Sequence, residues 1–156
     1  MSDTESITVT LTQEADFSFR IAFDGASLPD LISDESPPLG HGAGPDPTRL
    51  LVAALGSCLG SSLLFALRKF KNTPGTIVAR MRTYPTRNEH GRLRIGHIAA
   101  EIQLPENAGD YKQIERIIAQ FEDFCVVTQS VRAGIPVEVT VIDGEGAVLS
   151  GEIPSA

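Results

Sequence analysis

The chain has 156 residues, a length that suits a single domain. Hydrophobic residues make up 42% of it and charged residues 21%, the balance of a soluble globular protein rather than of a disordered chain. The net charge of −7 argues against nucleic acid as a partner, because nucleic acid requires a basic face. The start, MSDTESITVT, lacks the segments of a secretory signal. We therefore expect a cytoplasmic protein whose residues 1–156 form one domain.

Two strands are predicted near the N-terminus. Residues 7–13 (ITVTLTQ) alternate as a strand does, and residues 16–23 (DFSFRIAF) do so again. The second strand places its phenylalanines on one face and Arg20 on the other. Residues 13–15 are expected to form the turn of a hairpin. The stretch 26–44, rich in Pro, Gly, Asp and Ser, is expected to be one long irregular loop.

A long apolar helix is predicted within residues 45–71 (PDPTRLLVAALGSCLGSSLLFALRKFK), with Cys58 at its middle. Asp46-Pro47 suits a helix start, and the basic residues at the other end suit the negative end of the helix dipole. No charge lies between Leu50 and Leu67, so the helix is expected to be buried nearly all round. Its length is borderline for a membrane span, but small residues at its centre favour a core helix. Such a helix needs a sheet on one face and a partner subunit on another.

The rest of the chain predicts an α+β domain with the element order β-β-α-β-β-α-α-β. Two more strands follow the helix, then a helix of about eleven residues that Asp110 caps, with an apolar stripe at helical spacing. Cys125 begins a short third helix that Gly134 ends, and a last strand precedes a loose tail. The three strands are expected at residues 76–83, 93–104 and 135–142. Residues 88–91 are expected to form the turn between the first two of them.

The two cysteines are the residues whose placement points to chemistry. A helix N-terminus lowers the pKa of a thiol, which gives Cys125 a physical reason to react. Burial raises the pKa of a thiol, so Cys58 needs a cation beside it. From the residues alone, two inert core cysteines and a redox pair both remain open. The histidines at 41, 90 and 97 have no metal-ligand spacing, so no zinc site is expected.

The run GPDPTRLLVAALGSCLGSSLLFAL resembles the signature of the OsmC/Ohr family, which is Gly-x-(Asn/Asp)-Pro followed by an Ala-rich helix that carries a cysteine. The preceding DESPPLGHGAG, the later cysteine at the start of a short helix and the element order fit as well. The resemblance covers essentially the whole chain. It implies an OsmC-like α+β fold, with antiparallel sheets wrapped around a long central helix in an intertwined homodimer.

The resemblance also implies a thiol-dependent peroxidase that reduces organic hydroperoxides in stress defence. Cys58 would be the peroxidatic cysteine, which attacks the peroxide and becomes a sulfenic acid, and Cys125 would resolve it to a disulfide. A thiol or dithiol would then reduce that disulfide. The reaction needs no metal or organic cofactor. The implied partners are a second subunit, the hydroperoxide and the reductant, with neither nucleic acid nor membrane.

The peroxidases of the family also use an arginine from the N-terminal strands and a glutamate on the first turn of the helix. Arg20 is the candidate arginine, with a solvated surface arginine as the alternative. The glutamate position holds Thr48, which carries no charge, so Glu35 or the adjacent Asp34 would have to substitute. Val126 stands where the family often has proline. These departures keep a second hypothesis open: a non-catalytic redox-responsive or small-ligand-binding protein, or an inert structural relative.

Overall fold

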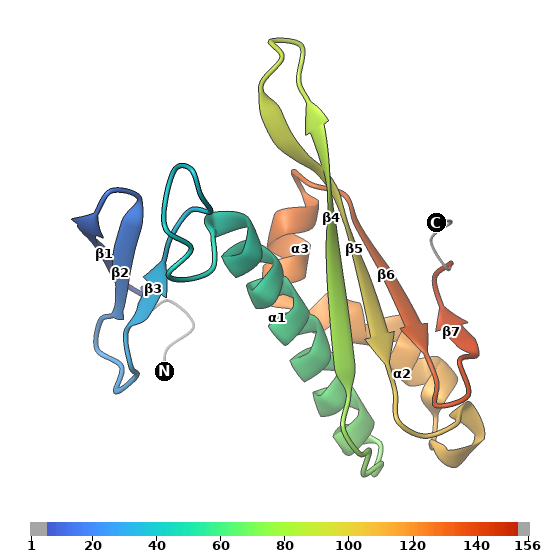
Figure 1. The fold of residues 1–156 in the computed structure, drawn as a ribbon. Helices are drawn as coiled ribbons and strands as arrows, with labels where there is room; N and C mark the ends of the chain where they lie inside the picture. The colour runs from blue at the N-terminus through green and yellow to red at the C-terminus, as the bar shows by residue number, and fades with distance from the viewer. Residues whose placement is uncertain (1–5, 153–156) are drawn as a thin grey trace. The chain divides into compact units, whose positions relative to one another are not determined.

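The computed structural model describes residues 6–152 (Figure 1). Contacts within the chain fall into two compact units, one ending at Leu51 and the other beginning at Val52. Both contain strands and helical residues, so the chain has the expected mixed α+β character. That residues 1–156 form one domain stays a prediction.

The first unit contains a three-stranded antiparallel sheet in the order β1-β2-β3. Its strands are β1 (Val9–Ala15), β2 (Ser18–Phe23) and β3 (Leu31–Ser33). The turn predicted at 13–15 is wrong: β1 continues to Ala15, and the chain turns at Asp16, whose φ is 46°. The stretch 26–44 is not wholly irregular, because β3 lies within it and pairs with β2. Three residues are too few for an alternating pattern to reveal a strand.

Helix α1 (Pro47–Lys69) has the start and end that the sequence predicts. The Asp46 carboxylate accepts the backbone N–H of Arg49 at 2.8 Å, as a capping residue does, and Pro47 opens the first turn. Arg68 and Lys69 lie in the last turn, where the dipole favours cations.

The second unit holds a four-stranded sheet in the order β4-β5-β6-β7. The expectation of antiparallel sheets is wrong at one pair, because β5 and β6 are parallel. The chain between them passes through helices, the kind of crossover that parallel neighbours require. Strand β7 lies in residues expected to form a loose tail. The four strands are β4 (Val78–Arg87), β5 (Leu93–Gln103), β6 (Val137–Ile142) and β7 (Val148–Ser150).

The crossover contains short helical pieces rather than the predicted helix of about eleven residues. Asp110 does not cap that helix: it ends a 3₁₀ turn, and Gln113 at φ 58° interrupts the chain before α2. The third helix is confirmed, with Cys125 at its N-cap. The four pieces are η1 (Ala108–Asp110), α2 (Ile114–Gln120), η2 (Phe121–Phe124) and α3 (Val126–Arg132).

One face of α1 forms the centre of the core of the second unit. Its four buried leucines have no exposed surface, and Gly56 lies so close to β4 that an added Cβ would come within 3.0 Å of the Met81 side chain. The expectation of burial all round is wrong for the single chain, because Phe65 on another face is 70% exposed. The buried leucines are Leu55, Leu59, Leu63 and Leu67.

Among the described residues, α1 is the helix whose length and composition would allow it to cross a membrane. The core helix of a soluble protein meets the same criterion, and the buried leucine face of α1 is of that kind. The helix is therefore compatible with a soluble protein, and a cytoplasmic location stays a prediction.

Replacing Leu63 with alanine tests the assignment of the buried face. We expect the free energy of unfolding to fall by about 2–5 kcal/mol, because the change leaves a cavity in the core. The matched control is Ser61→Ala, two positions away on an exposed face, which should change stability by less than about 0.5 kcal/mol. Urea denaturation followed by circular dichroism measures both. Equal losses for the two variants would contradict the assignment.

Candidate active site

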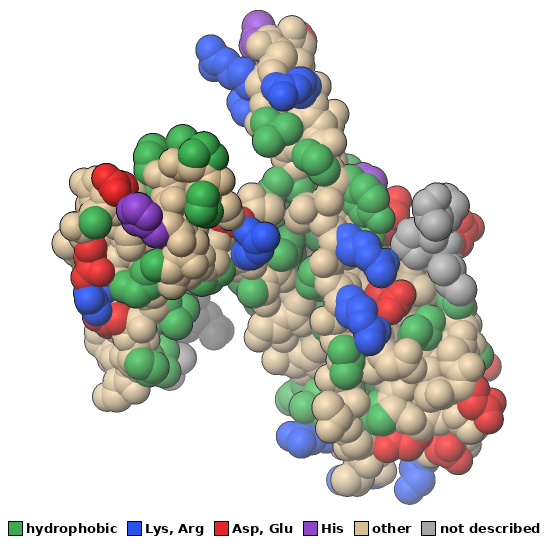
Figure 2. All heavy atoms as spheres, in the orientation of Figure 1, with side chains coloured by type: hydrophobic (Ala, Val, Ile, Leu, Met, Phe, Trp, Pro, Cys, Tyr) green, Lys and Arg blue, Asp and Glu red, His purple; other side chains and the backbone are tan. Residues whose placement is uncertain are grey.

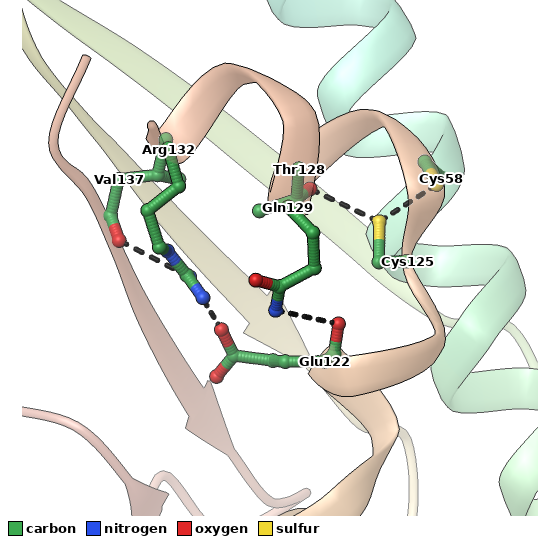
Figure 3. A network of polar contacts seen from close by, with 7 residues as sticks. All are labelled: Cys58, Glu122, Cys125, Thr128, Gln129, Arg132 and Val137. Atoms are coloured by element: carbon green, nitrogen blue, oxygen red, sulfur yellow. Dashed lines mark hydrogen bonds and ion pairs between the residues drawn. The ribbon is translucent and has the colours of Figure 1, made fainter. Parts of the chain in front are cut away.

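The second unit brings the two predicted cysteines together. The Sγ atoms of Cys58 on α1 and Cys125 at the start of α3 lie 2.7 Å apart, and both residues are free thiols (Figure 3). Cys125 is completely buried, whereas Cys58 is half-buried. The two sulfurs are therefore close enough for a disulfide to form between them.

Local structure explains how each cysteine reaches this position. Cys58 lies between the buried leucines Leu55 and Leu59 of α1, at the edge of its core face. Cys125 follows η2, whose Phe121 has no exposed surface and so anchors the turn in the core. The backbone of Cys125 is extended, with φ −83° and ψ 93°, as is typical of an N-cap residue.

Polar groups gather around the sulfur of Cys125. The hydroxyl oxygen of Thr128, a residue with no exposed surface, lies 3.0 Å from this sulfur. Burial alone disfavours ionisation of Cys125, but hydrogen bonds from Cys58, from the hydroxyl and N–H of Thr128 and from the Ser62 hydroxyl outweigh it. Together they lower the pKa of the Cys125 thiol.

Cys58 has the opposite tendency. Burial and the neighbouring Cys125 sulfur raise the pKa of the Cys58 thiol, and the backbone N–H groups of Val127 and Thr128 only partly offset them. Two thiols this close titrate as a pair, so the first proton lost leaves one anion that both sulfurs share. The surrounding donors favour that anion on Cys125, the sulfur with more hydrogen-bond partners.

A second polar network fixes α3 in place. Arg132 donates to the Glu122 carboxylate at 2.6 Å and to the carbonyl of Val137 at 3.2 Å, and Gln129 donates to the backbone carbonyl of Glu122 at 3.0 Å (Figure 3). These bonds join α3 to η2 and to β6. The sequence analysis missed Thr128, Ser62 and this network. The spacing Cys125-x-x-Thr128, which is that of an N-cap and its N3 residue, is the signal that was available.

Arg20, the candidate arginine, lies on β2 of the first unit and binds two acidic residues there. Its Nε atom is 2.6 Å from the Glu14 carboxylate, and its Nη1 atom is 3.7 Å from Asp30. The hydrogen bond and charge of Glu14 raise the pKa of Arg20. Glu35 is half-buried and is not among the partners of Arg20. Thr48 lies exposed on the first turn of α1.

Asp34, the other proposed substitute for the glutamate, holds the loop that follows β3. The residue is only 2% exposed, and its Oδ2 atom accepts the backbone N–H groups of His41 and Ala43, each at 3.0 Å. The Ala43 bond, opposed by burial and supported by the His41 bond, lowers the pKa of the Asp34 carboxyl. An added Cβ at Gly40 would come within 2.3 Å of Asp34 Oδ1, so this close approach requires glycine. Asp34 therefore stabilises the conformation of this loop.

The contacts of His41 and His97 are with residues other than the two cysteines. His41 binds Asp16 at 3.1 Å, and the ring of His97 stacks on Tyr84 with centroids 4.1 Å apart. Within residues 6–152, no group of three or more His, Cys, Asp or Glu side chains is arranged to hold a metal ion.

The sulfur pair, with one cysteine on a long central helix and the other at a short helix start, agrees with a family comparison. The OsmC-like protein family matches residues 40–140, which include both cysteines and the whole of both helices that carry them. The chain belongs to the OsmC-like family. No curated protein sequence matches this chain.

Solved structures of similar fold cover nearly the whole chain. An OsmC-like protein of unknown function from Vibrio cholerae has a TM-score of 0.74 at 19% identity, covering 89% of this chain and 100% of that one. An organic hydroperoxide resistance protein from Elizabethkingia anophelis gives 0.66 at 20% identity, covering 90% and 98%. The organic hydroperoxide resistance protein OhrB of Bacillus subtilis gives 0.63 at 16%, covering 88% and 98%. These likenesses establish the OsmC-like fold.

The sulfur geometry predicts an intramolecular disulfide. Treatment of the reduced protein with diamide should remove both thiols, lower the intact mass by two hydrogens and leave a single chain on a non-reducing gel. The bond closes a loop of 67 residues, so it should raise the free energy of unfolding by about 4 kcal/mol. Cys125→Ser should prevent all of these changes. Oxidation that joins two chains through Cys58 or Cys125 would contradict the geometry.

The lowered pKa of Asp34 predicts that the stability of the first unit falls in acid. Its folded pKa is lowered, so its contribution to stability is present above its unfolded pKa of about 3.9 and is lost as the pH falls through the folded value. Asp34→Asn should therefore lower stability at pH 7 and flatten the acid side of the stability profile. Glu35→Gln is the adjacent control. Urea denaturation of both variants between pH 3 and 7 makes the test, and an unchanged acid slope in Asp34→Asn would contradict it.

Proposed function

We propose that this protein is a thiol-dependent peroxidase that reduces organic hydroperoxides through Cys58 and Cys125. The observation that carries the proposal is the 2.7 Å separation of the two sulfurs. Membership of the OsmC-like family supports it, as do fold relatives named as organic hydroperoxide resistance proteins.

The pair can begin the reaction without an external base. At this separation, the proton of Cys58 can pass to the Cys125 thiolate, and Cys58 then attacks the terminal oxygen of the hydroperoxide. An S–O bond forms and the O–O bond breaks. The alkoxide takes the proton that Cys125 received and leaves as an alcohol, so Cys58 is left as a sulfenic acid and Cys125 is again a thiolate. Half-buried Cys58 is the more accessible sulfur, which suits it to meet the peroxide first.

The second step uses the buried cysteine. The Cys125 thiolate attacks the sulfur of the Cys58 sulfenic acid, so the S–S bond forms and the S–O bond breaks. The hydroxide that leaves takes a proton and becomes water. A small thiol or dithiol then restores both thiols by exchange.

An apolar cavity near the sulfurs supports an organic substrate. It has a volume of about 70 Å³, and aromatic side chains make up much of its lining. Ser62 lies at its wall and is also a hydrogen-bond partner of Cys125, which links the cavity to the sulfur pair. A hydrocarbon substituent on the peroxide gains free energy by entering such a space. The aromatic residues are Phe65, Phe70, Phe121 and Phe124.

The homodimer and Arg20 complete the proposal. Large apolar side chains lie exposed on the first unit, and Leu11, Leu28 and Leu39 are each more than half exposed in the single chain (Figure 2). Exposed apolar surface of this extent favours a partner. In the proposed homodimer, Arg20 of one copy reaches the Cys58 of the other and polarises the peroxide, and Glu14 and Asp30 orient its guanidinium.

Consumption of cumene hydroperoxide tests the function. The reduced protein without added thiol should consume one equivalent per pair and form the disulfide, and with dithiothreitol it should turn over. Cys58→Ser should fall to the uncatalysed rate, because the remaining thiol, Cys125, is completely buried. Cys125→Ser should consume one equivalent and stop as a sulfenic acid. Ser61→Ala is the matched control and should retain full activity.

The same experiment separates the alternatives. A wild-type protein that stops at a Cys58 sulfenic acid without a disulfide would favour a redox-responsive protein. Thiols that hydroperoxide leaves unchanged would overturn the proposal and favour a ligand-binding or structural protein. Hydrogen peroxide serves as a second substrate, and consumption faster than that of cumene hydroperoxide would contradict a role for the apolar cavity.

A further inference from the structure

Thr128 has a feature that the redox pair alone does not explain. A hydroxyl group with no exposed surface requires a hydrogen-bond partner, and for Thr128 that partner is a sulfur: Thr128 Oγ1 lies 3.0 Å from Cys125 Sγ (Figure 3). Thr128 lies on the first turn of α3, three residues after Cys125.

The contact between Thr128 and Cys125 favours one ionisation state of the sulfur. Cys58 lies on one side of the Cys125 sulfur at 2.7 Å, and the Thr128 hydroxyl approaches the same sulfur from α3 (Figure 3). Once Cys125 is ionised, the hydroxyl can only donate to it, because a thiolate has no proton to give. Hydrogen bonds from neutral groups to an anion are stronger than those to a neutral thiol, so this contact favours the ionised form.

We propose that Thr128 is a positioning residue for disulfide formation: its hydroxyl holds the Cys125 sulfur, as a thiolate, against Cys58. The inference rests on the proposed peroxidase function. It assigns Thr128 to the second step, in which Cys125 attacks the sulfenic acid of Cys58, the S–S bond forms, the S–O bond breaks and water leaves. Ser62 assists from α1 as a weaker partner of the same sulfur.

No charged side chain competes for this role among the described elements packed on Cys125. Cys58 is the titratable group that faces it from α1. On η2 and α3, Glu122 and Arg132 bind each other at 2.6 Å, and neither is a hydrogen-bond partner of the sulfur. Asp123 of η2 is exposed to solvent. The stabilisation of the Cys125 anion therefore falls to the Cys58 thiol and to hydroxyl and backbone groups.

The test compares Thr128→Val, which keeps the shape and removes the hydroxyl, with Thr128→Ser, which restores it. Each reduced variant is mixed with one equivalent of cumene hydroperoxide, and a dimedone reagent traps the Cys58 sulfenic acid at successive times. We expect Thr128→Val to form the sulfenic acid at the wild-type rate but the disulfide about tenfold more slowly. Its disulfide-formation rate should also peak at higher pH. Thr128→Ser should restore both.

Thr140→Val is the control for the loss of a buried threonine, since the Thr140 hydroxyl binds the carbonyl of Glu152 rather than a sulfur. Its disulfide-formation rate should match that of the wild type. A Thr128→Val protein that forms the disulfide at the wild-type rate and with the wild-type pH profile would overturn the proposal. Equal slowing of both steps would do so as well, because that is the signature of a disturbed fold.

A second measurement keeps the two proposals apart. The ultraviolet absorbance of thiolate, followed against pH in the absence of peroxide, should show the first ionisation of the pair at higher pH in Thr128→Val than in Thr128→Ser or the wild type. If the wild-type protein fails to consume hydroperoxide, the peroxidase function is wrong, and this titration still tests Thr128. An unchanged titration in Thr128→Val would overturn the role of Thr128 whatever the activity.

Discussion

The contact between the sulfurs of Cys58 and Cys125 is the interaction on which the candidate chemistry depends. It joins α1 to the start of α3, although the two cysteines are 67 positions apart in the sequence. Helix α1 is fixed by its buried leucine face, but α3 has only seven residues and cannot hold a position by itself. The bonds of Arg132 to Glu122 and to Val137 hold α3 in place, because they connect it to the preceding turn and to β6.

Helix α1 has to satisfy two demands. Its leucine face builds the core of the second unit, while its other faces carry small residues and the exposed Phe65. A soluble chain rarely leaves a helix this apolar uncovered, so the exposed faces give the homodimer proposal a physical basis that does not depend on the family. The same faces explain why the helix passes a membrane criterion based on composition alone.

The sequence was sufficient for features with a strong local signal. Asp46-Pro47 and the terminal cations determined the bounds of α1, and both cysteines were found with their helices. It failed where tertiary contacts decide. Strand β3 is too short to show a pattern, and the parallel pairing of β5 with β6 follows from the crossover rather than from either strand. The left-handed Gln113 divides an apolar stripe that had suggested one helix. Thr128 was missed because the spacing Cys125-x-x-Thr128 does not by itself show whether the threonine hydroxyl contacts a sulfur or a carbonyl.

The way the sulfur anion is stabilised bears on the absence of a glutamate at Thr48. The Cys58 thiol, hydroxyl groups and backbone N–H groups of the second unit favour the anion on Cys125 without a guanidinium, whereas burial still raises the pKa of the Cys58 thiol. An arginine is therefore not needed to hold the Cys125 thiolate, and the role that we propose for it is at Cys58 and the peroxide. That role tolerates a different carboxylate partner, because it requires only that the guanidinium be oriented. Glu14 and Asp30 already orient Arg20 within the first unit. A chain built in this way can lack the glutamate of the helix and still keep its two sulfurs in contact.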